Sequence, residues 1–263
     1  MTEVRAKKAL GQHFLTDLNI ARKICDSLSG GTPAAPCPVL EVGCGTGVLT
    51  RFLLEREDIT LYGAEVDTES IVYLHEYFPG FAPRLMEGDF LRMNLAEQFP
   101  QGVNIIGNFP YNISSQIFFQ VLEYRDLIPE VVGMVQREVA VRIAEPPGSK
   151  EYGILSVFLQ AFYDIEYLFT VSEGVFNPPP KVKSAVIRLR RNGVQRLDCD
   201  ERLFMKVVKA TFNQRRKTIR NSLRAAFGDF GGAEHEFFSL RPEVLGVAQF
   251  VGLTDWVQRH LRG

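Results

Sequence analysis

The chain has few of the residues that build metal sites and disulfide frameworks. Its 263 residues include only four cysteines, at positions 25, 37, 44 and 199, with no C-x-x-C spacing and no neighbouring histidine. Zinc sites and disulfide frameworks are recognised by such spacings. The sequence therefore predicts isolated, reduced thiols and no bound metal.

Long apolar runs are also absent. No stretch approaches the ~18 residues that a membrane-spanning helix needs, and the first residues, MTEVR, lack the apolar core of a signal peptide. The hydrophobic fraction of 46% and the charged fraction of 23% are those of an ordinary globular protein. We expect a monomeric, cytoplasmic protein with no membrane partner. The length favours one large domain and a small one.

Acidic residues are nearly missing from one segment. Residues 178–224 contain fourteen Lys or Arg and three acids, a net charge of +11. The other 216 residues therefore carry −12, because the whole chain carries −1. This asymmetry favours a polyanion as the partner of the later part of the chain. A solvated helix face would also account for it.

Short apolar strands alternate with helical patterns through most of the first 190 residues. Such alternation predicts a mainly parallel, doubly wound sheet covered on both faces. The last two predicted strands have no clear helix between them and would pair as an antiparallel hairpin at one edge. We expect strands at 39–42, 60–66, 84–87, 103–107, 131–136, 164–171 and 184–190, and helices at 47–56, 69–78, 114–124 and 137–144.

Beyond a linker at 192–195 the pattern becomes helical. Helices are predicted at 200–213, 217–227 and 254–261. The sequence thus predicts an α/β domain at residues 1–191 and a small all-helical domain at 192–263. The first fifteen residues form a basic arm of the α/β domain.

A glycine-rich loop follows the first predicted strand. The stretch VLEVGCGTGVLT places Gly43, Gly45 and Gly47 there, where glycines allow a tight turn and a close approach of a nucleoside to the backbone. The dinucleotide fingerprint G-x-G-x-x-G would require glycine at the position of Val48. The loop alone is therefore weak support for a nicotinamide cofactor, and purely structural glycines are an alternative.

Acidic residues follow the next two predicted strands. Glu65 lies twenty residues after Gly45, at the end of the second strand, where its carboxylate can accept hydrogen bonds from ribose hydroxyls. Asp89 follows the third strand and can accept from the exocyclic amine of adenine, with Phe90 packing on the ring. This set fits an adenosine bound without a pyrophosphate, and it favours S-adenosyl-L-methionine (SAM) over a nicotinamide cofactor.

The fourth predicted strand ends in the turn NFPYN, which begins at Asn108. Ligands of doubly wound sheets lie beyond the carboxyl ends of the strands, so this turn shares a crevice with the glycine loop. The Asn108 side-chain oxygen and the Pro110 carbonyl can accept from both N–H bonds of adenine N6 and favour its attack on a methyl sulfonium. Tyr111 can stack on the base. The turn could also be only a helix N-terminus, capped by Asn112 or Ser114.

These residues resemble a known family. The motifs GQHFL, EVGCGTGVLT, NFPYNISS, VFNPPPKVKSAVIRL and TFNQRRKTIRNSL are similar to those of the small-subunit (16S) ribosomal RNA adenine N6,N6-dimethyltransferases, from residue 7 to the helical C-terminus. The resemblance implies a Rossmann-like class I SAM-dependent methyltransferase. It also implies that N6 of two adjacent adenosines near the 3′ end of small-subunit rRNA is dimethylated, with the rRNA and the pre-small ribosomal subunit as partners.

The resemblance assigns further site residues. It implies that Phe176, held by the proline run 178–180, is a second aromatic face for the target base; core packing is the ordinary reading of this residue. The family more often has leucine in place of Phe109 and asparagine in place of His13. The SAM site that it implies contains His13, Leu15, Gly43, Glu65, Asp89 and Asn108.

RNA binding is expected to depend on basic side chains. Adenosines must leave their stack to reach a buried methyl donor, so phosphate contacts must supply affinity, and binding should weaken with salt. Residues 206–224 contain seven basic residues and no acid, and helical spacing would place Arg216, Arg220 and Arg224 on one face. The predicted RNA-binding residues are Arg5, Lys7, Lys8, Lys181, Arg215, Arg216, Lys217 and Arg220.

Three other functions are compatible with part of this pattern. The macrolide-resistance methyltransferases share the glycine loop, the Asn-x-Pro-Tyr turn and the aromatic before the proline run but modify large-subunit rRNA; GQHFL and FNQRRKTIRNSL favour the small-subunit family. DNA adenine methylation is less favoured, because no separate DNA-recognition segment is evident. A factor that monitors ribosome assembly is compatible with the same chain and can coexist with catalysis.

Overall fold

A computed structural model describes residues 4–261, which divide into two compact units. The first unit contains the described residues up to Ala140 together with Asp164–Arg191. The second contains Val141–Tyr163 and the described residues from Asn192 onward. The sequence-based division differs because it kept 141–163 in the first domain. In the structure α7 (Ile154–Gln160) packs on α8 (Glu201–Phe212) of the second unit.

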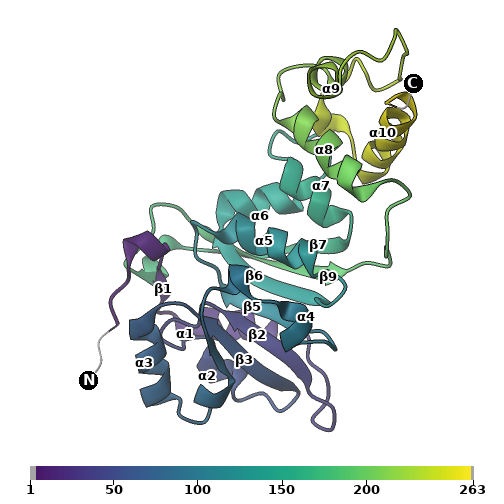
Figure 1. Cartoon of the computed structure of the whole chain (residues 1–263). Helices are drawn as coiled ribbons and strands as arrows, with labels where there is room; N and C mark the ends of the chain where they lie inside the picture. Colours follow the sequence, from purple (N-terminus) through teal and green to yellow (C-terminus); the bar gives the residue numbers. More distant parts are fainter. Residues whose placement is uncertain (1–3, 262–263) are drawn as a thin grey trace. The chain divides into compact units, whose positions relative to one another are not determined.

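The first unit is built on a seven-stranded sheet with the order β4-β3-β2-β5-β6-β9-β7 (Figure 1). Every pair from β4 to β6 is parallel, whereas β9 is antiparallel to β6. The predicted mainly parallel sheet is thus confirmed, and the last two strands are neighbours at one edge. The strands are β2 (Cys37–Val42), β3 (Ile59–Glu65), β4 (Leu85–Glu87), β5 (Asn104–Asn108), β6 (Glu130–Gln136), β7 (Tyr163–Val171) and β9 (Ser184–Arg191).

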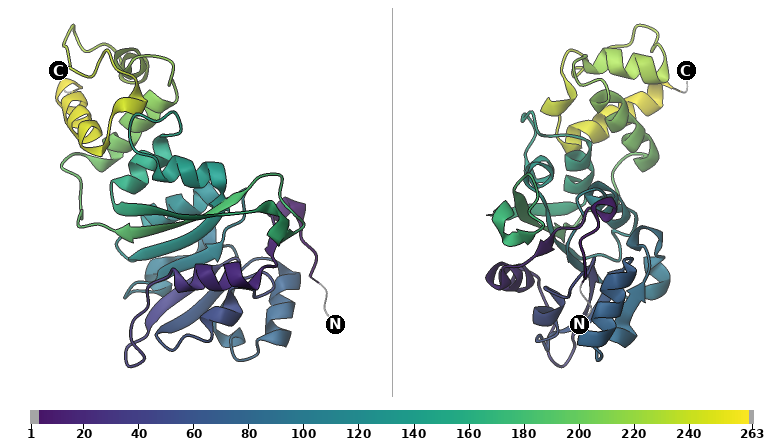
Figure 2. Two further views of the ribbon diagram at one scale, coloured as in Figure 1. Left: turned by 180° about the vertical axis from the view of Figure 1, so that it is seen from behind. Right: turned by 90° about the vertical axis from the view of Figure 1, so that its left-hand side faces the viewer.

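Near-continuous apolar runs form the central strands because both faces of the sheet are covered. In β6, Val132 and Met134 point into one core cluster, while Val131 and Val135 are fully buried on the opposite face. The first cluster includes residues of α1 (Leu18–Asp26), α2 (Thr50–Leu53) and α3 (Thr68–Tyr77). Helix α5 (Ser114–Glu123) packs on the other face, and Figures 1 and 2 show α1 and α5 on opposite sides of the sheet. Two short helices, α4 (Leu95–Gln98) and α6 (Arg137–Ala144), complete the set up to residue 144.

Several elements were not among those predicted from the sequence, including the helices α4 and α7. Helix α1 begins after Asp17, whose carboxylate accepts hydrogen bonds from the N–H groups of Asn19 and Ile20 and so satisfies the helix N-terminus. The two-residue strands β1 (Phe14–Leu15) and β8 (Phe176–Asn177) pair with each other, antiparallel. Short 3-10 turns were not predicted either: η1 (Lys8–Leu10), η2 (Ala82–Arg84), η3 (Phe90–Arg92), η4 (Glu173–Val175) and η5 (Pro242–Val244).

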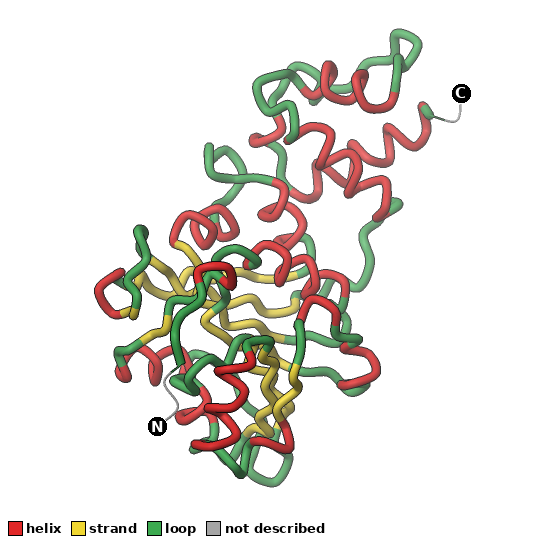
Figure 3. The backbone as a smooth tube through the Cα atoms, turned by 60° about the vertical axis from the view of Figure 1, so that its left-hand side comes forward, coloured by secondary structure: helices red, strands yellow, loops and turns green. Residues whose placement is uncertain are grey.

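The second unit contains α7 and α8 with α9 (Ile219–Phe227) and α10 (Val247–His260), and residues 192–261 contain no strand (Figure 3). Aromatic side chains dominate its core: Phe212 lies 5.9 Å from Phe250 between ring centroids, and Trp256 lies edge-on to Phe230. Helix α9 begins two residues later than predicted, at Ile219. Arg216 therefore lies in the turn after α8, and the predicted helical face with Arg220 and Arg224 is wrong for this residue.

The described residues add two observations on thiols and membranes. All four cysteines are unpaired, with Cys25 and Cys44 buried, and burial raises the pKa of each of these two thiols. Within residues 4–261, no helix is both long enough and apolar enough to cross a bilayer.

The Phe109 ring fills a space that Gly107 and Gly133 leave open, because neither glycine has a Cβ. Its side chain is fully buried against Phe118, and a Cβ at Gly133 would lie 2.4 Å from the Phe109 ring. Because an aromatic ring cannot bend away, Gly133→Ala should lower the free energy of unfolding by about 2 kcal/mol. Adding Phe109→Leu should restore part of that loss. Denaturant unfolding of the single and double variants measures this coupling.

Gly80→Ala is the matched control, because a Cβ at Gly80 would meet nothing within 4 Å. If Gly133→Ala and Gly80→Ala unfolded at the same denaturant concentration, the packing of Phe109 on Gly133 would not be as described.

Candidate active site

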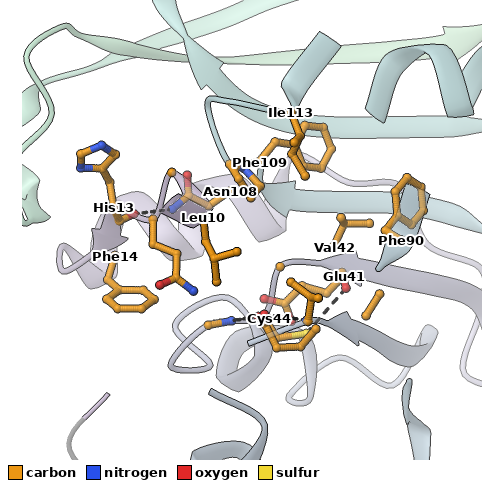
Figure 4. Close-up of a pocket in the computed structure, with 18 of the residues that line it drawn as sticks. Leu10, His13, Phe14, Glu41, Val42, Cys44, Phe90, Asn108, Phe109 and Ile113 are labelled. Carbon is orange, nitrogen blue, oxygen red and sulfur yellow. Dashed lines mark hydrogen bonds between the residues drawn. The ribbon is translucent and has the colours of Figure 1, made fainter. Parts of the chain in front are cut away.

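A cavity of about 230 Å³ lies at the carboxyl ends of the parallel strands in the first unit (Figure 4). It opens where β2 and β5 are neighbours and the strand order changes direction, which is where doubly wound folds bind ligands. The loop after β2, the end of β3, the loop after β4 and the end of β5 all line it. The structure brings together ten of the predicted residues here: His13, Leu15, Gly43, Gly45, Glu65, Asp89, Phe90, Asn108, Pro110 and Tyr111.

The glycine loop has the backbone conformation that its sequence requires. Gly43, Gly45 and Gly47 have φ angles of 76°, 54° and 72°, the left-handed region that side chains disfavour. A Cβ at Gly47 would also lie 2.4 Å from the ring of Phe78. The loop can therefore turn tightly and present bare backbone to the cavity.

Glu65 is held mainly by backbone groups. Its Oε2 accepts from the N–H of Gly45 at 2.8 Å, and its Oε1 accepts from the N–H groups of Val66 and Asp67, both at 2.9 Å. Burial raises the pKa of Glu65, and these three hydrogen bonds oppose that rise. A carboxylate has about four acceptor positions, so the arrangement leaves room for one ribose hydroxyl where the sequence had suggested two.

A second carboxyl group, Glu41, lies under the loop and was not predicted. It is 1% exposed, lines the cavity and accepts a hydrogen bond from the Thr50 hydroxyl at 2.6 Å (Figure 4). Burial raises the pKa of Glu41 to about 8, helped by the nearby charge of Glu65. A protonated Glu41 next to Glu65 leaves a single negative charge at this end of the cavity.

Asp89 and Phe90 lie together on the cavity wall. The Asp89 Oδ1 accepts the N–H of Leu91 at 3.0 Å and caps the turn Phe90–Arg92. Its Oδ2 lies 3.7 Å from the Arg92 guanidinium, and Phe90 is 4% exposed. The cap fixes the Asp89 carboxylate at the cavity wall, which Phe90 also lines.

The N-terminal arm, defined here as residues 5–15, covers the glycine loop and the end of β5. The Asn108 Nδ2 donates to the carbonyl of His13 at 2.9 Å (Figure 4), and the Asn112 Nδ2 donates to the carbonyl of Ala9 at 3.2 Å. A Cβ at Gly45 would lie 3.0 Å from the ring of Phe14. The β1–β8 pairing anchors the end of the arm. Sequence reasoning missed these contacts, because they join segments far apart in the chain.

The carbonyl of His13 fixes the orientation of the Asn108 amide. A carbonyl can only accept, so the amide nitrogen must face it, and the Asn108 Oδ1 has no hydrogen-bond partner among residues 4–261. The Pro110 carbonyl accepts the N–H of Ile113 at 3.2 Å, which leaves one of its two acceptor positions. Two acceptors thus remain available at the end of β5.

Tyr111 is anchored at its hydroxyl group. This hydroxyl is hydrogen-bonded to the Ser184 Oγ in β9, and burial raises the pKa of Tyr111. The His13 ring lies against the tyrosine, with centroids 5.1 Å apart and planes tilted by 34°. The His13 Nδ1 donates to the carbonyl of Pro178 at 2.8 Å. These contacts hold the aromatic ring at the cavity wall.

Phe176 does not line this cavity. It is 4% exposed and belongs to the core cluster that contains Leu15, its partner in the β1–β8 pairing. Its role as a second face for the target base stays a prediction, and it would require the side chain to become uncovered.

The predicted RNA-binding residues are in different environments. Lys7 pairs with Asp67 and Glu69, and the Asp67 hydrogen bond raises the pKa of Lys7. The backbone N–H of Arg5 donates to Glu69. Lys8 and Lys181 are exposed.

In the second unit, two of these residues are paired and two are exposed. Arg215 lies 3.7 Å from Glu243, and Arg220 pairs with Glu234. Arg216 and Lys217 are exposed, with no ion pair among the described residues.

Acidic side chains elsewhere neutralise much of the basic segment 178–224. Arg188 pairs with Glu166, Arg190 with both Glu166 and Glu130, Arg191 with Asp126, and Arg224 with Asp229. Charge counted along the sequence therefore overstates the charge that the folded surface offers.

Comparisons with known proteins agree with this geometry. The sequence model described as ribosomal RNA adenine dimethylase matches residues 3–248. The ribosomal RNA small subunit methyltransferase A of Parabacteroides distasonis is 56% identical over 263 residues, which cover 99% of this chain and 97% of that protein.

Two solved structures share the fold. A dimethyladenosine transferase from Plasmodium falciparum has a TM-score of 0.77 at 22% identity, covering 94% of this chain and 98% of that one. The 23S rRNA methyltransferase ErmE has a TM-score of 0.65 at 27% identity, covering 92% of this chain and 99% of that one.

The sheet order and the cavity at its switch point define an α/β protein of the class I methyltransferase type. The chain belongs to the ribosomal RNA adenine dimethylase family. The resemblance based on the sequence motifs is thus confirmed.

The raised pKa of Glu41 has a consequence for stability. The folded protein holds this proton more tightly than the unfolded chain, so the free energy of unfolding should fall as the pH rises from about 4.5 to about 8 and level off above. Glu41→Gln keeps an oxygen for Thr50 but cannot ionise. We expect it to reduce the decline by on the order of 4 kcal/mol, measured by denaturant unfolding between pH 5 and pH 9.

Glu57→Gln is the control, because Glu57 is an exposed carboxylate of the same unit. A slope against pH that is the same in the wild type and both variants would show that Glu41 is ionised throughout.

Proposed function

We propose that this protein transfers methyl groups from SAM to N6 of two adjacent adenosines in a loop near the 3′ end of small-subunit rRNA. The observation that carries the proposal is the shared cavity: the glycine loop with Glu65 and the Asn108–Tyr111 turn line the same space. Family membership and the full-length similarity to small-subunit methyltransferases support the same choice.

The residues of the cavity fit SAM. The left-handed glycine backbone allows close approach, Glu65 keeps one acceptor position for a ribose hydroxyl, and Asp89 with Phe90 suits an adenine edge and face. A dinucleotide fingerprint would instead require glycine at the position of Val48. When bound, SAM supplies an electrophilic methyl group on a positively charged sulfur.

Asn108 is the proposed catalytic amide. Adenine N6 is a poor nucleophile, because its lone pair is delocalised into the ring. The Asn108 Oδ1 and the remaining acceptor position of the Pro110 carbonyl would accept its two N–H bonds, favour a pyramidal nitrogen and disperse the developing positive charge. The amide cannot rotate freely, because the carbonyl of His13 holds its nitrogen. This preorganisation spares the cost of orienting the acceptor during the reaction.

Tyr111 is proposed to stack on the extruded base. The hydrogen bond of its hydroxyl to Ser184 fixes the ring. Because the His13 ring lies against Tyr111, the ring face away from His13 is the better candidate for stacking with the base. Phe176 would add a second face only after a local rearrangement. No strong base is needed, because the methylated ammonium is acidic enough to release its proton to water.

The pre-small ribosomal subunit is the proposed partner, with the protein acting as a cytoplasmic monomer. Exposed cations on both units, among them Lys181, Arg216 and Lys217, support binding to a polyanion. A role in monitoring assembly is compatible with the same contacts. Tritiated SAM added to small subunits that lack the modification should give dimethyladenosine after nucleoside digestion. Primer-extension stops in large-subunit rRNA alone would instead favour the macrolide-resistance activity.

Asn108→Ala tests the catalytic amide. Loss of a preorganised acceptor should lower kcat by about 10²–10³, measured as methyl transfer to small subunits. Asn112→Ala is the matched control, since it also removes a side-chain hydrogen bond to a carbonyl of the arm, and we expect it to lose less than about fivefold. Equal rates for the wild type and Asn108→Ala would exclude the role given to this residue.

Arg216→Gln with Lys217→Gln tests the phosphate contacts. Both side chains are exposed after α8, so their removal should lower the slope of log affinity against log salt by about 1.4, at ~0.7 for each phosphate of a single strand. Binding to unmodified small subunits across a salt series measures the slope.

Arg220→Gln with Arg224→Gln removes the same charge from residues that pair with Glu234 and Asp229. This pair should change the slope less. A larger change of the slope in the Arg220/Arg224 variant than in the Arg216/Lys217 variant would place the RNA on α9 and not on the turn before it.

A further inference from the structure

One basic residue of the N-terminal arm, Lys7, pairs with the acidic residues that follow Glu65. The Lys7 ammonium contacts the carboxylate of Asp67 and lies 3.1 Å from that of Glu69, at the N-terminus of α3. The Lys7 side chain is 38% exposed and that of Asp67 is 1% exposed. A cation placed on a buried carboxylate is poorly available to a phosphate.

Asp67 collects contacts from both the arm and α3. Its carboxylate accepts from the Lys7 ammonium and from the N–H and hydroxyl of Ser70, and so caps the N-terminus of α3. Burial alone would raise the pKa of Asp67, but these hydrogen bonds outweigh burial and hold it below its usual value. The arm therefore closes on an ionised, buried carboxylate.

Asp67 is also joined to the cofactor site through its backbone. The backbone N–H of Asp67 donates to Glu65, whose other oxygen accepts from Gly45 of the glycine loop. The negative charge of Asp67 also raises the pKa of Glu65. The contact between Lys7 and Asp67 therefore lies one residue-to-residue hydrogen bond away from the proposed ribose acceptor.

The other end of the arm holds the catalytic turn. Between Lys7 and His13 the chain closes on itself, with the N–H of Lys7 donating to the Gln12 Oε1 at 2.8 Å. His13 then offers its carbonyl to Asn108. Residues 7–13 thus contact the acidic side of the cavity at one end and the proposed catalytic amide at the other.

We propose that Lys7 is a positioning residue that latches the arm over the SAM pocket through Asp67. The inference rests on the proposed function, and it replaces the prediction that Lys7 binds RNA phosphate. The latch stabilises the form in which the cavity is covered and Asn108 is oriented. Its loss weakens cofactor binding before any RNA is present.

Calorimetric titration of the full chain with SAM, without RNA, tests the latch. Lys7→Met should weaken SAM binding about tenfold, because it leaves a buried carboxylate without its cation. Lys8→Met is the matched control: it removes the same charge from the next residue, which is exposed, and it should leave SAM affinity unchanged. Lys7→Arg keeps the ion pair and should stay within about threefold of wild type.

A second measurement separates the latch from a phosphate contact. Lys7→Met should leave the salt slope of rRNA binding unchanged, whereas a phosphate contact would lower it by about 0.7. Unchanged SAM affinity in Lys7→Met together with a lower salt slope would overturn the inference. Failure of the wild type to bind SAM would instead overturn the proposed function and not the latch specifically.

Asp67→Asn is a second variant for the same SAM titration, for use if Lys7→Met does not fold. Asparagine still caps α3 but removes the charge that Lys7 pairs with. The variant should weaken SAM binding to a similar extent, and adding Lys7→Met should cause no further loss, because both changes break one pair. Independent, additive losses would mean that the two residues act separately.

Discussion

The hydrogen bond from the Asn108 amide to the carbonyl of His13 is the constraint on which the site depends. It joins the end of β5 to the N-terminal arm, two segments that are 95 residues apart in the chain. Because the nitrogen is committed to this carbonyl, the oxygen must point elsewhere and stays available as an acceptor. The arm that supplies the carbonyl also covers the glycine loop through Phe14. A covered cofactor pocket and an oriented amide are therefore two results of one docked segment.

Acidic residues after the parallel strands do two jobs at once. Asp67 and Asp89 cap the elements that follow β3 and β4, and Glu65 collects three backbone N–H groups. Each carboxylate is thereby fixed by the local turn before any ligand arrives, which lowers the cost of ordering the site. The same hydrogen bonds use up acceptor positions. Rigidity and free acceptor capacity thus compete at Glu65.

The fold was predictable wherever the signal was local. Apolar runs next to glycine gave the parallel strands, and the glycine loop with its acidic partners gave the cavity residues, because parallel strands bring their carboxyl ends to one edge. The pairing of β1 with β8 was not predictable, since two-residue strands carry no periodicity. For the same reason the pairing of Phe176 with Leu15 could not be predicted, although core packing was the ordinary reading of Phe176. Segment 141–163 was assigned to the α/β domain because it precedes the predicted linker at 192–195, and its packing on α8 is a long-range contact that no local pattern shows.

The basic segment 178–224 shows why charge counted along a sequence is a weak guide to a binding surface. Its cations divide into those with acidic partners and those without, and only the second group gains a new counterion from a phosphate. Arg190 and Arg220 already have carboxylate partners, so an incoming phosphate must compete with Glu130 or Glu234. A phosphate that displaces a carboxylate from an arginine adds little binding free energy, because one ion pair replaces another of similar strength. The polyanion affinity of this segment must therefore be concentrated in fewer residues than its net charge suggests.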